Sequence, residues 1–255
     1  MRYREHLPTG RWRGLVECGW TFEAAATDRV TDVLPDGCMD LVWTGTQLLV
    51  AGPDTATRPA VRSAGSPAAG LRFAPGVLPA LLGVPAAELR DRRVPLATLL
   101  PRLAPPVEER LFRGASVVAE RRGTRGPATP DGRVPLDVTA LHVLAALAPV
   151  LPGAPPDPAI RAAAARLGSG ASATETADAL GWTSRTLHRR CLAAFGYGPA
   201  VLRRVLRFRR AGALLVAGVA PAEVAARAGY ADQPHLSREV RSLAGVSPAA
   251  LATRR

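Results

Sequence analysis

The sequence predicts an α+β fold, with a β-rich N-terminal domain and an all-α C-terminal domain. Short apolar runs separated by turn residues come first, a pattern typical of strands. Apolar residues then recur at helical spacing, first over 107–123 and again from Ala159 to the end. We therefore expect three parts. They are a β-rich domain with a helical extension over 1–121, a linker with one short helix over 122–157, and a helical domain over 158–255.

Four segments of the N-terminal part are expected to contain strands: GLVECGWTF, DVLPDGCMDLVW, TQLLVAG and AAGLRFAPG. The tripeptide Pro35-Asp36-Gly37 predicts a tight turn inside the second of them. Two Gly- and Pro-rich loops are expected at 122–135 and 151–158. Between these loops, the apolar residues 136–150 predict a short helix.

Two segments of the C-terminal part, 172–196 and 220–245, share one pattern of residue types. Each has a glycine followed by an aromatic residue, then a leucine with an arginine two positions later, and a closing Gly-x-x-Pro. The matching pairs are Gly181 and Gly229, Trp182 and Tyr230, Leu187 and Leu236, Arg189 and Arg238, Gly196 and Gly245, and Pro199 and Pro248. Glycine allows the left-handed turn between two helices, so each segment predicts a helix-turn-helix unit. A helix over 199–217 is expected to join the units.

The second helix of each unit is expected to have an apolar inner face and a basic, polar outer face. Thr183 and Asp232 are expected to cap these two helices. The inward-facing residues are expected to be Leu187, Cys191 and Ala194 in the first unit, and Leu236, Val240 and Leu243 in the second. A basic outer face on such a helix suits the major groove of DNA. Trp182 and Tyr230 are expected to pack at the hinges.

The charge of the chain favours a polyanionic partner. The formal net charge is +12, and all 33 basic residues are arginine, because the sequence has no lysine. Residues 157–255 hold 15 of the arginines against 6 acidic residues, so most of the excess lies there. Five arginines of the joining helix predict either a solvated face or phosphate contacts: Arg203, Arg204, Arg207, Arg209 and Arg210.

The last hundred or so residues resemble the DNA-binding domain of AraC/XylS-type transcriptional regulators. EVAARAGYADQPHLSREVRSLAGVSP is similar to that family's signature over nearly its whole length, and ALGWTSRTLHRRCLAAFGYGP and RVLRFRRAGALL also fit. Cys191 and Val240 stand where the family usually has phenylalanine, and Ala231 is a further departure. The resemblance implies a sequence-specific regulator, more often an activator, whose two recognition helices enter successive major grooves of double-stranded DNA.

The resemblance also implies which side chains meet DNA. The expected DNA-binding residues are Ser184, Arg185, Thr186, His188, Arg189, Gln233, Pro234, Ser237, Arg238 and Arg241. Arginine and glutamine bind guanine and adenine, respectively, through paired hydrogen bonds. Ser184, Thr186 and Arg241 are expected to contact phosphates instead of bases. An activator would also contact RNA polymerase.

Within this family, the N-terminal region usually senses a ligand or mediates dimerisation, often as a cupin-like β-barrel. LPDGCMDLVW, AGPDT, GLRFAPG and LLGVPAAELRD resemble an N-terminal domain found in some actinobacterial members. A small-molecule effector and a homodimer are therefore expected partners. Asp36, Asp40, Trp43 and Arg72 are candidates to line an effector pocket, with turn, cap or salt-bridge roles as the alternative.

The sequence favours no enzyme, cofactor or metal. Among the N-terminal residues only His6 and His142 are histidines, and they lie far apart. No nucleophile elbow, P-loop or Rossmann glycine pattern is present.

Cys18 and Cys38 are expected to lie in strands as buried thiols. A redox or soft-metal sensor, or an alkyl-accepting DNA-repair regulator, remains the alternative. A non-specific architectural DNA binder is a further alternative. With no signal peptide or membrane span, a cytoplasmic location is expected.

Overall fold

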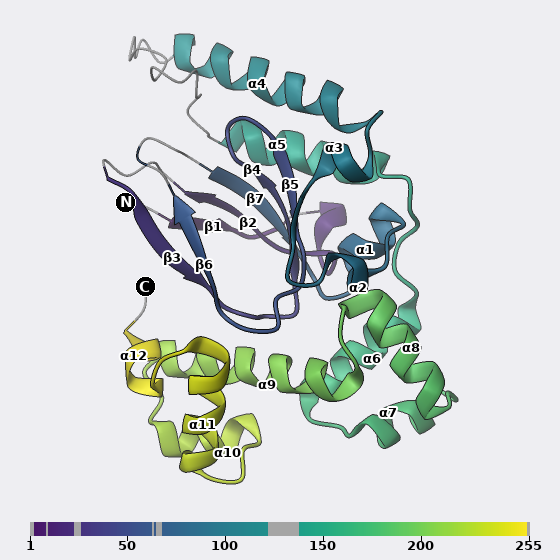
Figure 1. Ribbon diagram of the computed structural model, residues 1–255, viewed down its shortest axis with the longest axis vertical. Helices are drawn as coiled ribbons and strands as arrows, with labels where there is room; N and C mark the ends of the chain where they lie inside the picture. The colour runs from purple at the N-terminus through teal and green to yellow at the C-terminus, as the bar shows by residue number, and fades with distance from the viewer. Residues whose placement is uncertain are drawn as a thin grey trace.

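A computed structural model describes the β-rich N-terminal part and the helical C-terminal part of the chain (Figure 1). The residues that it describes are 3–8, 10–22, 27–62, 64, 68–121 and 138–253. The expected loop at 122–135 lies outside them. In Figure 1 the N-terminal part lies above the long helix α9, which has a group of short helices at each end.

The described strands form two antiparallel sheets. Their bounds are β1 Tyr3–His6, β2 Val16–Phe22, β3 Arg29–Val33, β4 Met39–Trp43, β5 Leu48–Ala51, β6 Arg58–Arg62, β7 Ala68–Phe73 and β8 Arg93–Pro95. Six of them pair in the order β1-β2-β7-β4-β5-β8, and β3 pairs with β6 alone. Within the described ranges the larger sheet therefore ends at β1 and β8, without closing into a barrel.

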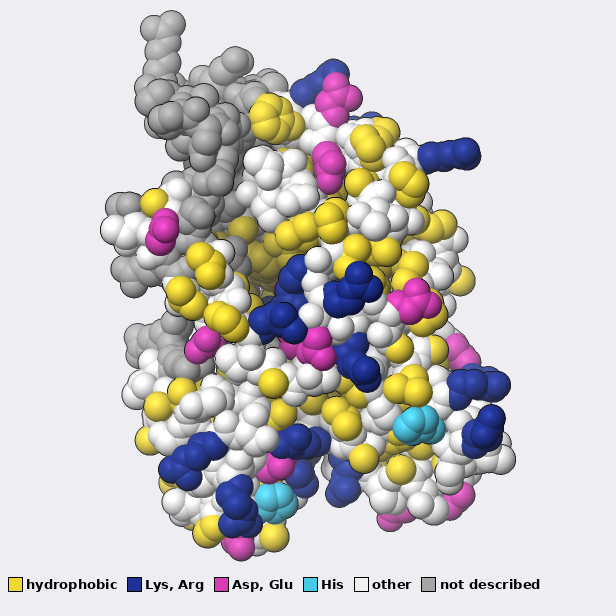
Figure 2. All heavy atoms as spheres, viewed as in Figure 1, with side chains coloured by type: hydrophobic (Ala, Val, Ile, Leu, Met, Phe, Trp, Pro, Cys, Tyr) yellow, Lys and Arg dark blue, Asp and Glu magenta, His cyan; other side chains and the backbone are white. Residues whose placement is uncertain are grey.

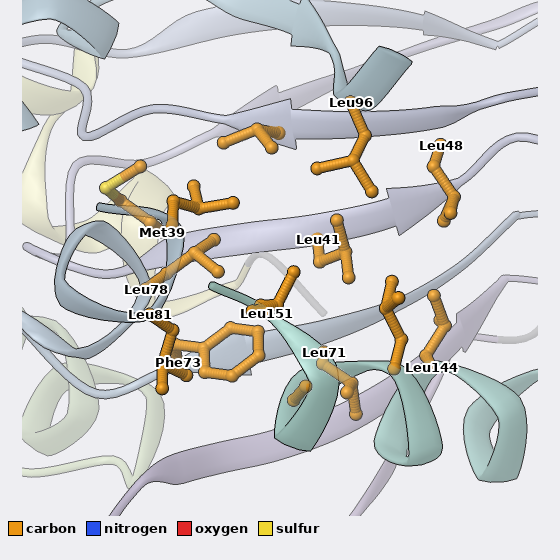
Figure 3. Close-up of a cluster of buried hydrophobic side chains, with 14 of the residues drawn as sticks. Met39, Leu41, Leu48, Leu71, Phe73, Leu78, Leu81, Leu96, Leu144 and Leu151 are labelled. Atoms are coloured by element: carbon orange, nitrogen blue, oxygen red, sulfur yellow. The ribbon is translucent and has the colours of Figure 1, made fainter. Parts of the chain in front are cut away.

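Helices cover one face of the six-stranded sheet. They are α1 Val77–Leu82, α2 Ala86–Leu89, α3 Leu96–Leu99, α4 Ala104–Arg121 and α5 Val138–Leu147. In β4, Met39, Leu41 and Trp43 alternate with less buried residues, because successive side chains of a strand point to opposite faces. Figure 3 shows strand residues such as Leu41 and Leu71 lying opposite Leu144 of α5 in this core.

The expected strands and helices of the N-terminal part are confirmed, with additions. The four expected segments contain β2, β4 with the last two residues of β3, β5 and β7, while α4 and α5 correspond to the two expected helices. The segments β1, β6, β8 and α1 to α3 are short, from three to six residues, and so carry little periodicity. Cys38 lies just before β4 instead of in a strand, because Asp36 accepts a hydrogen bond from its amide (2.8 Å) and holds it in the turn.

The C-terminal part consists of seven helices within the described residues. They are α6 Pro158–Ser169, α7 Ala173–Ala179, α8 Ser184–Phe195, α9 Pro199–Val216, α10 Pro221–Ala228, α11 Gln233–Ala244 and α12 Pro248–Ala252. The helices form two separate apolar clusters. One joins α6, α7 and α8 to the first half of α9, and the other joins α10, α11 and α12 to its second half. The two units therefore have their own cores and share one helix.

Candidate DNA-binding interface

The first helix-turn-helix unit consists of α7 and α8. Ser172 caps α7 in a capping box with Glu175, whose carboxylate accepts a hydrogen bond from the Ser172 amide (2.7 Å). Gly181 then takes the left-handed conformation (φ 64°) that the turn requires. Thr183 accepts the amide hydrogen bond of Thr186 (3.1 Å) and so caps α8. The predicted turn and cap of the first unit are confirmed.

The second unit repeats this arrangement with α10 and α11. Gly229 is left-handed (φ 77°), and Asp232 caps α11 by accepting a hydrogen bond from the His235 amide (2.6 Å). Pro234 lies in the first turn of α11, where its missing N–H leaves no bond unmade. The ring of His235 packs edge-on against Tyr230, with centroids 5.2 Å apart. The predicted turn and cap of the second unit are therefore also confirmed.

The inner faces of α8 and α11 agree with the sequence pattern at all but one position. Leu187, Cys191, Leu236, Val240 and Leu243 are all buried, as expected. Ala194 is only half-buried, because Phe195 fills the core at the end of α8 instead. Tyr230 is buried as a hinge residue, and Trp182 is half-buried under the guanidinium of Arg190, which lies 4.5 Å from the ring centroid.

The ten residues expected to bind DNA lie on the outer faces of α8 and α11. Eight of them are exposed, while Thr186 and Ser237 are half-buried. Thr186 accepts a hydrogen bond from the Thr183 hydroxyl (3.0 Å), so its side chain belongs to the cap of α8. The imidazole of His188 packs beside Gly198, where a Cβ atom would come within 2.8 Å of the ring. The other outer-face side chains leave the two helices open to a large partner.

Four exposed arginines of these faces have no acidic partner in the part of the chain that the structure describes. Within the described ranges, no acidic side chain pairs with Arg185, Arg189, Arg238 or Arg241. Figure 2 shows basic side chains on both lower lobes of the molecule, where Figure 1 places the two units. Each unit thus presents uncompensated positive charge on its second helix.

The arginines of α9 are, by contrast, half-buried and mostly bonded to other groups of the protein. Arg204 binds both carboxylate oxygens of Glu239 (3.1 and 2.9 Å), and Arg207 lies 3.6 Å from the same group. Arg209 pairs with Glu17 (2.7 Å), and Arg210 donates to the carbonyl of Ala228 (2.7 Å). Arg203 is half-buried. These side chains tie α9 to its neighbours, so they are not simply a solvated face.

Three of the four residues expected to line an effector pocket lie together in the N-terminal part. Arg72 lies 3.2 Å from Asp40 and 3.3 Å from Asp36, and the indole of Trp20 donates to Asp40 (3.0 Å). Burial raises the pKa of Asp36, and the charge of Arg72 opposes that rise. Burial also opposes the positive charge of Arg72, but Asp40 and Asp36 outweigh it and raise the pKa of Arg72.

Trp43, the fourth candidate, lies on the opposite face of the sheet from this cluster. It is 1% exposed and packs in the apolar core, because it is three residues from Asp40 along the same strand. The cluster borders a cavity of about 20 Å³, which Asp54 and Arg93 also line. That volume has room for about one water molecule. In this structure the cluster is therefore a partly buried ion-pair network.

The cysteines lie in surroundings that keep their thiols protonated. Burial raises the pKa of Cys18 to about 12 and raises that of Cys38 well above its usual value. A thiol reacts mainly as its thiolate, so these surroundings do not favour a redox or alkyl-accepting role.

No group of three His, Cys, Asp or Glu side chains suited to a metal ion occurs among the residues that the structure describes. In the same residues, no helix is long and apolar enough to cross a membrane.

Several side-chain hydrogen bonds join the N-terminal part to the two units, and no sequence pattern predicted them. Tyr197 donates to the carbonyl of Asp54, Thr57 to that of Leu243 and Arg90 to that of Gly196, while Arg209 of α9 binds the carboxylate of Glu17. Most of these contacts use backbone oxygens, which any residue carries. Neither the composition of the sequence nor the spacing of its residues therefore predicts these contacts.

Comparison with known families gives two matches along the chain. Residues 4–95 match a domain of unknown function (DUF6597), and residues 176–254 match a helix-turn-helix domain. No curated protein matched the sequence. The second match covers most of the two capped helix pairs and the whole of the helix that joins them, which supports a DNA-binding transcription regulator.

The C-terminal part of the chain is a helix-turn-helix domain. Similar solved structures include the C-terminal domain of AraT, a response regulator from Geobacillus stearothermophilus. It is 25% identical, with 39% of this chain and 87% of that one covered and a TM-score of 0.36. A probable AraC family regulator from Rhodopseudomonas palustris is 20% identical over 38% of this chain and 97% of that one (TM-score 0.34). ToxT from Vibrio cholerae O395 is 10% identical, and the match covers 92% of this chain and 96% of ToxT, with a TM-score of 0.46.

Proposed function

We propose that this regulator binds a specific DNA site by placing α8 and α11 in two successive major grooves. The observation that carries the proposal is the contrast between its arginines. Three of the five on α9 pair with Glu239 or Glu17, whereas Arg185, Arg189, Arg238 and Arg241 are exposed on the two recognition helices and pair with no acidic side chain among the described residues. Free guanidinium groups on such helices suit guanine edges and phosphates.

The length of α9 supports the same arrangement. Its 18 residues span about 27 Å at about 1.5 Å per residue. Successive major grooves on one face of B-DNA lie about 34 Å apart. Because each unit adds its own width beyond the ends of α9, the two recognition helices have room to span that spacing. We expect Arg185, His188 and Arg189 to contact bases of one half-site, and Gln233, Pro234, Ser237 and Arg238 bases of the other. Ser184, Thr186 and Arg241 are expected at phosphates.

We further propose that an effector acts through the N-terminal part, by shifting how the two units are presented. The turn at Pro35–Cys38 supports this, since it contacts the ion-pair network on one side and α9 on the other. Asp36 pairs with Arg72, while the Cys38 sulfur accepts a hydrogen bond from Arg209 (3.5 Å). A Cβ atom on Gly37 would lie 3.2 Å from Leu206 of α9. A second copy of the chain and RNA polymerase are the partners proposed from the family resemblance.

Selection of bound sequences from a random DNA pool tests the DNA-binding proposal. We expect a site with two short specified segments about one helical turn apart. Replacing Arg189 should relax base choice in one segment, and replacing Arg238 in the other. A pool that yields no preferred sequence, with binding set by salt alone, would show a non-specific binder.

A further inference from the structure

One segment of the N-terminal part touches both helix-turn-helix units. The segment is Pro53–Thr57, the connection between β5 and β6. At its first end, the hydroxyl of Tyr197 donates to the carbonyl of Asp54 (3.3 Å) in a buried position. At its other end, Thr57 donates from both its amide and its hydroxyl to the carbonyl of Leu243 (2.9 and 2.8 Å). A single connection thus bridges two elements that are far apart along the chain.

Both contacts are made at the ends of the recognition helices. Leu243 lies in the last turn of α11, where a carbonyl has no partner within its own helix. Thr57 supplies the two missing donors. Tyr197 follows Gly196, which ends α8, and the Gly196 carbonyl accepts a hydrogen bond from Arg90 (3.1 Å). Each recognition helix is therefore fastened at its C-terminal end, away from its N-terminal exposed residues.

The segment itself is held rigidly from inside the N-terminal part. Arg93 binds both carboxylate oxygens of Asp54 (3.0 and 2.6 Å), and Asp54 is 6% exposed. Asp91 accepts hydrogen bonds from the amide (2.8 Å) and hydroxyl (3.0 Å) of Thr55. Before the segment, Gly52 packs so tightly that a Cβ atom would lie 1.7 Å from the Leu89 carbonyl. Because the segment is fixed in this way, it constrains the positions of Tyr197 and Leu243, which it binds.

We infer that Pro53–Thr57 is a clamp that sets the relative position of the two recognition helices, with Thr57 and Tyr197 as its positioning residues. The inference rests on the proposed use of two successive grooves. Helix α9 is one connection between the two helix-turn-helix units, and the clamp is a second connection between the same units. Two connections hold the separation and the rotation of the units more firmly than the shared helix does alone.

The test is the dependence of DNA affinity on the spacing between the two half-sites. The probes carry the selected site, the same site with insertions of up to about five base pairs, roughly half a turn of DNA, or one half-site alone. The variant T57V/Y197F removes one side-chain hydrogen bond from each end of the clamp. The control T31V/Y3F also removes one threonine and one tyrosine hydroxyl. In the wild type, these hydroxyls donate to the Ala60 carbonyl and the Glu5 carboxylate, within the strands of the N-terminal part.

For T57V/Y197F we expect unchanged affinity for a single half-site and a roughly three- to tenfold loss of discrimination between spacings, from two lost hydrogen bonds. The control should discriminate as the wild type does. If T57V/Y197F also discriminates as the wild type does, the clamp is refuted. A wild type without any spacing preference would instead refute the two-groove proposal. Should the double variant not fold, T57V alone gives the same comparison with a smaller expected loss.

Discussion

The docking of the first recognition helix on the N-terminal part can be measured with two glycine substitutions. Gly196 and Gly245 hold the same position in the two units, just after α8 and after α11. Both are left-handed, with φ of 80° and 70°. Their surroundings differ. A Cβ atom at Gly196 would lie 2.7 Å from Pro53 Cγ and 3.2 Å from the carbonyl oxygen of Ala86, whereas a Cβ atom at Gly245 would meet nothing within 4 Å.

The structure sets the size of the two effects. An alanine in the left-handed conformation costs about 1–2 kcal/mol, so Gly245→Ala should lower the free energy of unfolding by about that amount. Gly196→Ala carries the same cost and adds a clash. Overpacking of this kind costs about 1–3 kcal/mol, since a proline ring and a backbone carbonyl must both move. We therefore expect a total loss of about 2–5 kcal/mol for Gly196→Ala.

The assay is urea unfolding of the full chain, followed by tryptophan fluorescence, with the slopes compared to establish that the transitions are of the same kind. The double variant G196A/P53A should recover part of the extra loss, because it removes the closer of the two clashing atoms. Equal losses for Gly196→Ala and Gly245→Ala would refute the close approach of the N-terminal part to α8.

Three further predictions concern DNA binding, helix capping and pH. Arg189→Ala should weaken binding to the selected site by about 1–3 kcal/mol in fluorescence anisotropy, while Arg113→Ala, an equal charge loss on α4, should change it little. Asp232→Ala should cost about 1 kcal/mol of unfolding free energy in urea, because α11 loses its cap; an unchanged midpoint would contradict that role. Burial raises the pKa of Cys191 to about 12. As pH rises above about 9, the unfolded chain loses this proton first, so stability should fall by up to about 1.4 kcal/mol per pH unit from this thiol. Cys191→Ala should make that slope shallower in urea unfolding between about pH 9 and 11, and an unaltered slope would argue against a protonated thiol there.

The helix-turn-helix units could be predicted from the sequence because their determinants are local. Gly181 and Gly229 mark the turns, and Thr183 and Asp232 bond amides three residues ahead. Such signals lie within one or two helical turns of the residue that they affect. The same holds for the inner faces, where burial follows the helical period.

The contacts between the two parts could not be predicted in this way. Thr57 and Leu243 are 186 residues apart, and the acceptor is a backbone carbonyl. For the effector candidates, strand alternation alone separates Trp43 from Asp40, but it does not show that Arg72 on another strand faces Asp40. That pairing depends on β4 lying next to β7, and the register of two strands distant in sequence has no local signal.

The two apolar clusters of the C-terminal part share no residue, although α9 contributes Leu202 to one and Phe208 to the other. If α8 and α11 read separate half-sites as proposed, substitutions on the outer surface of α11 would change the choice of bases in one half-site and leave the packing beneath α8 untouched. The target sequence of such a protein would then be free to change one half at a time.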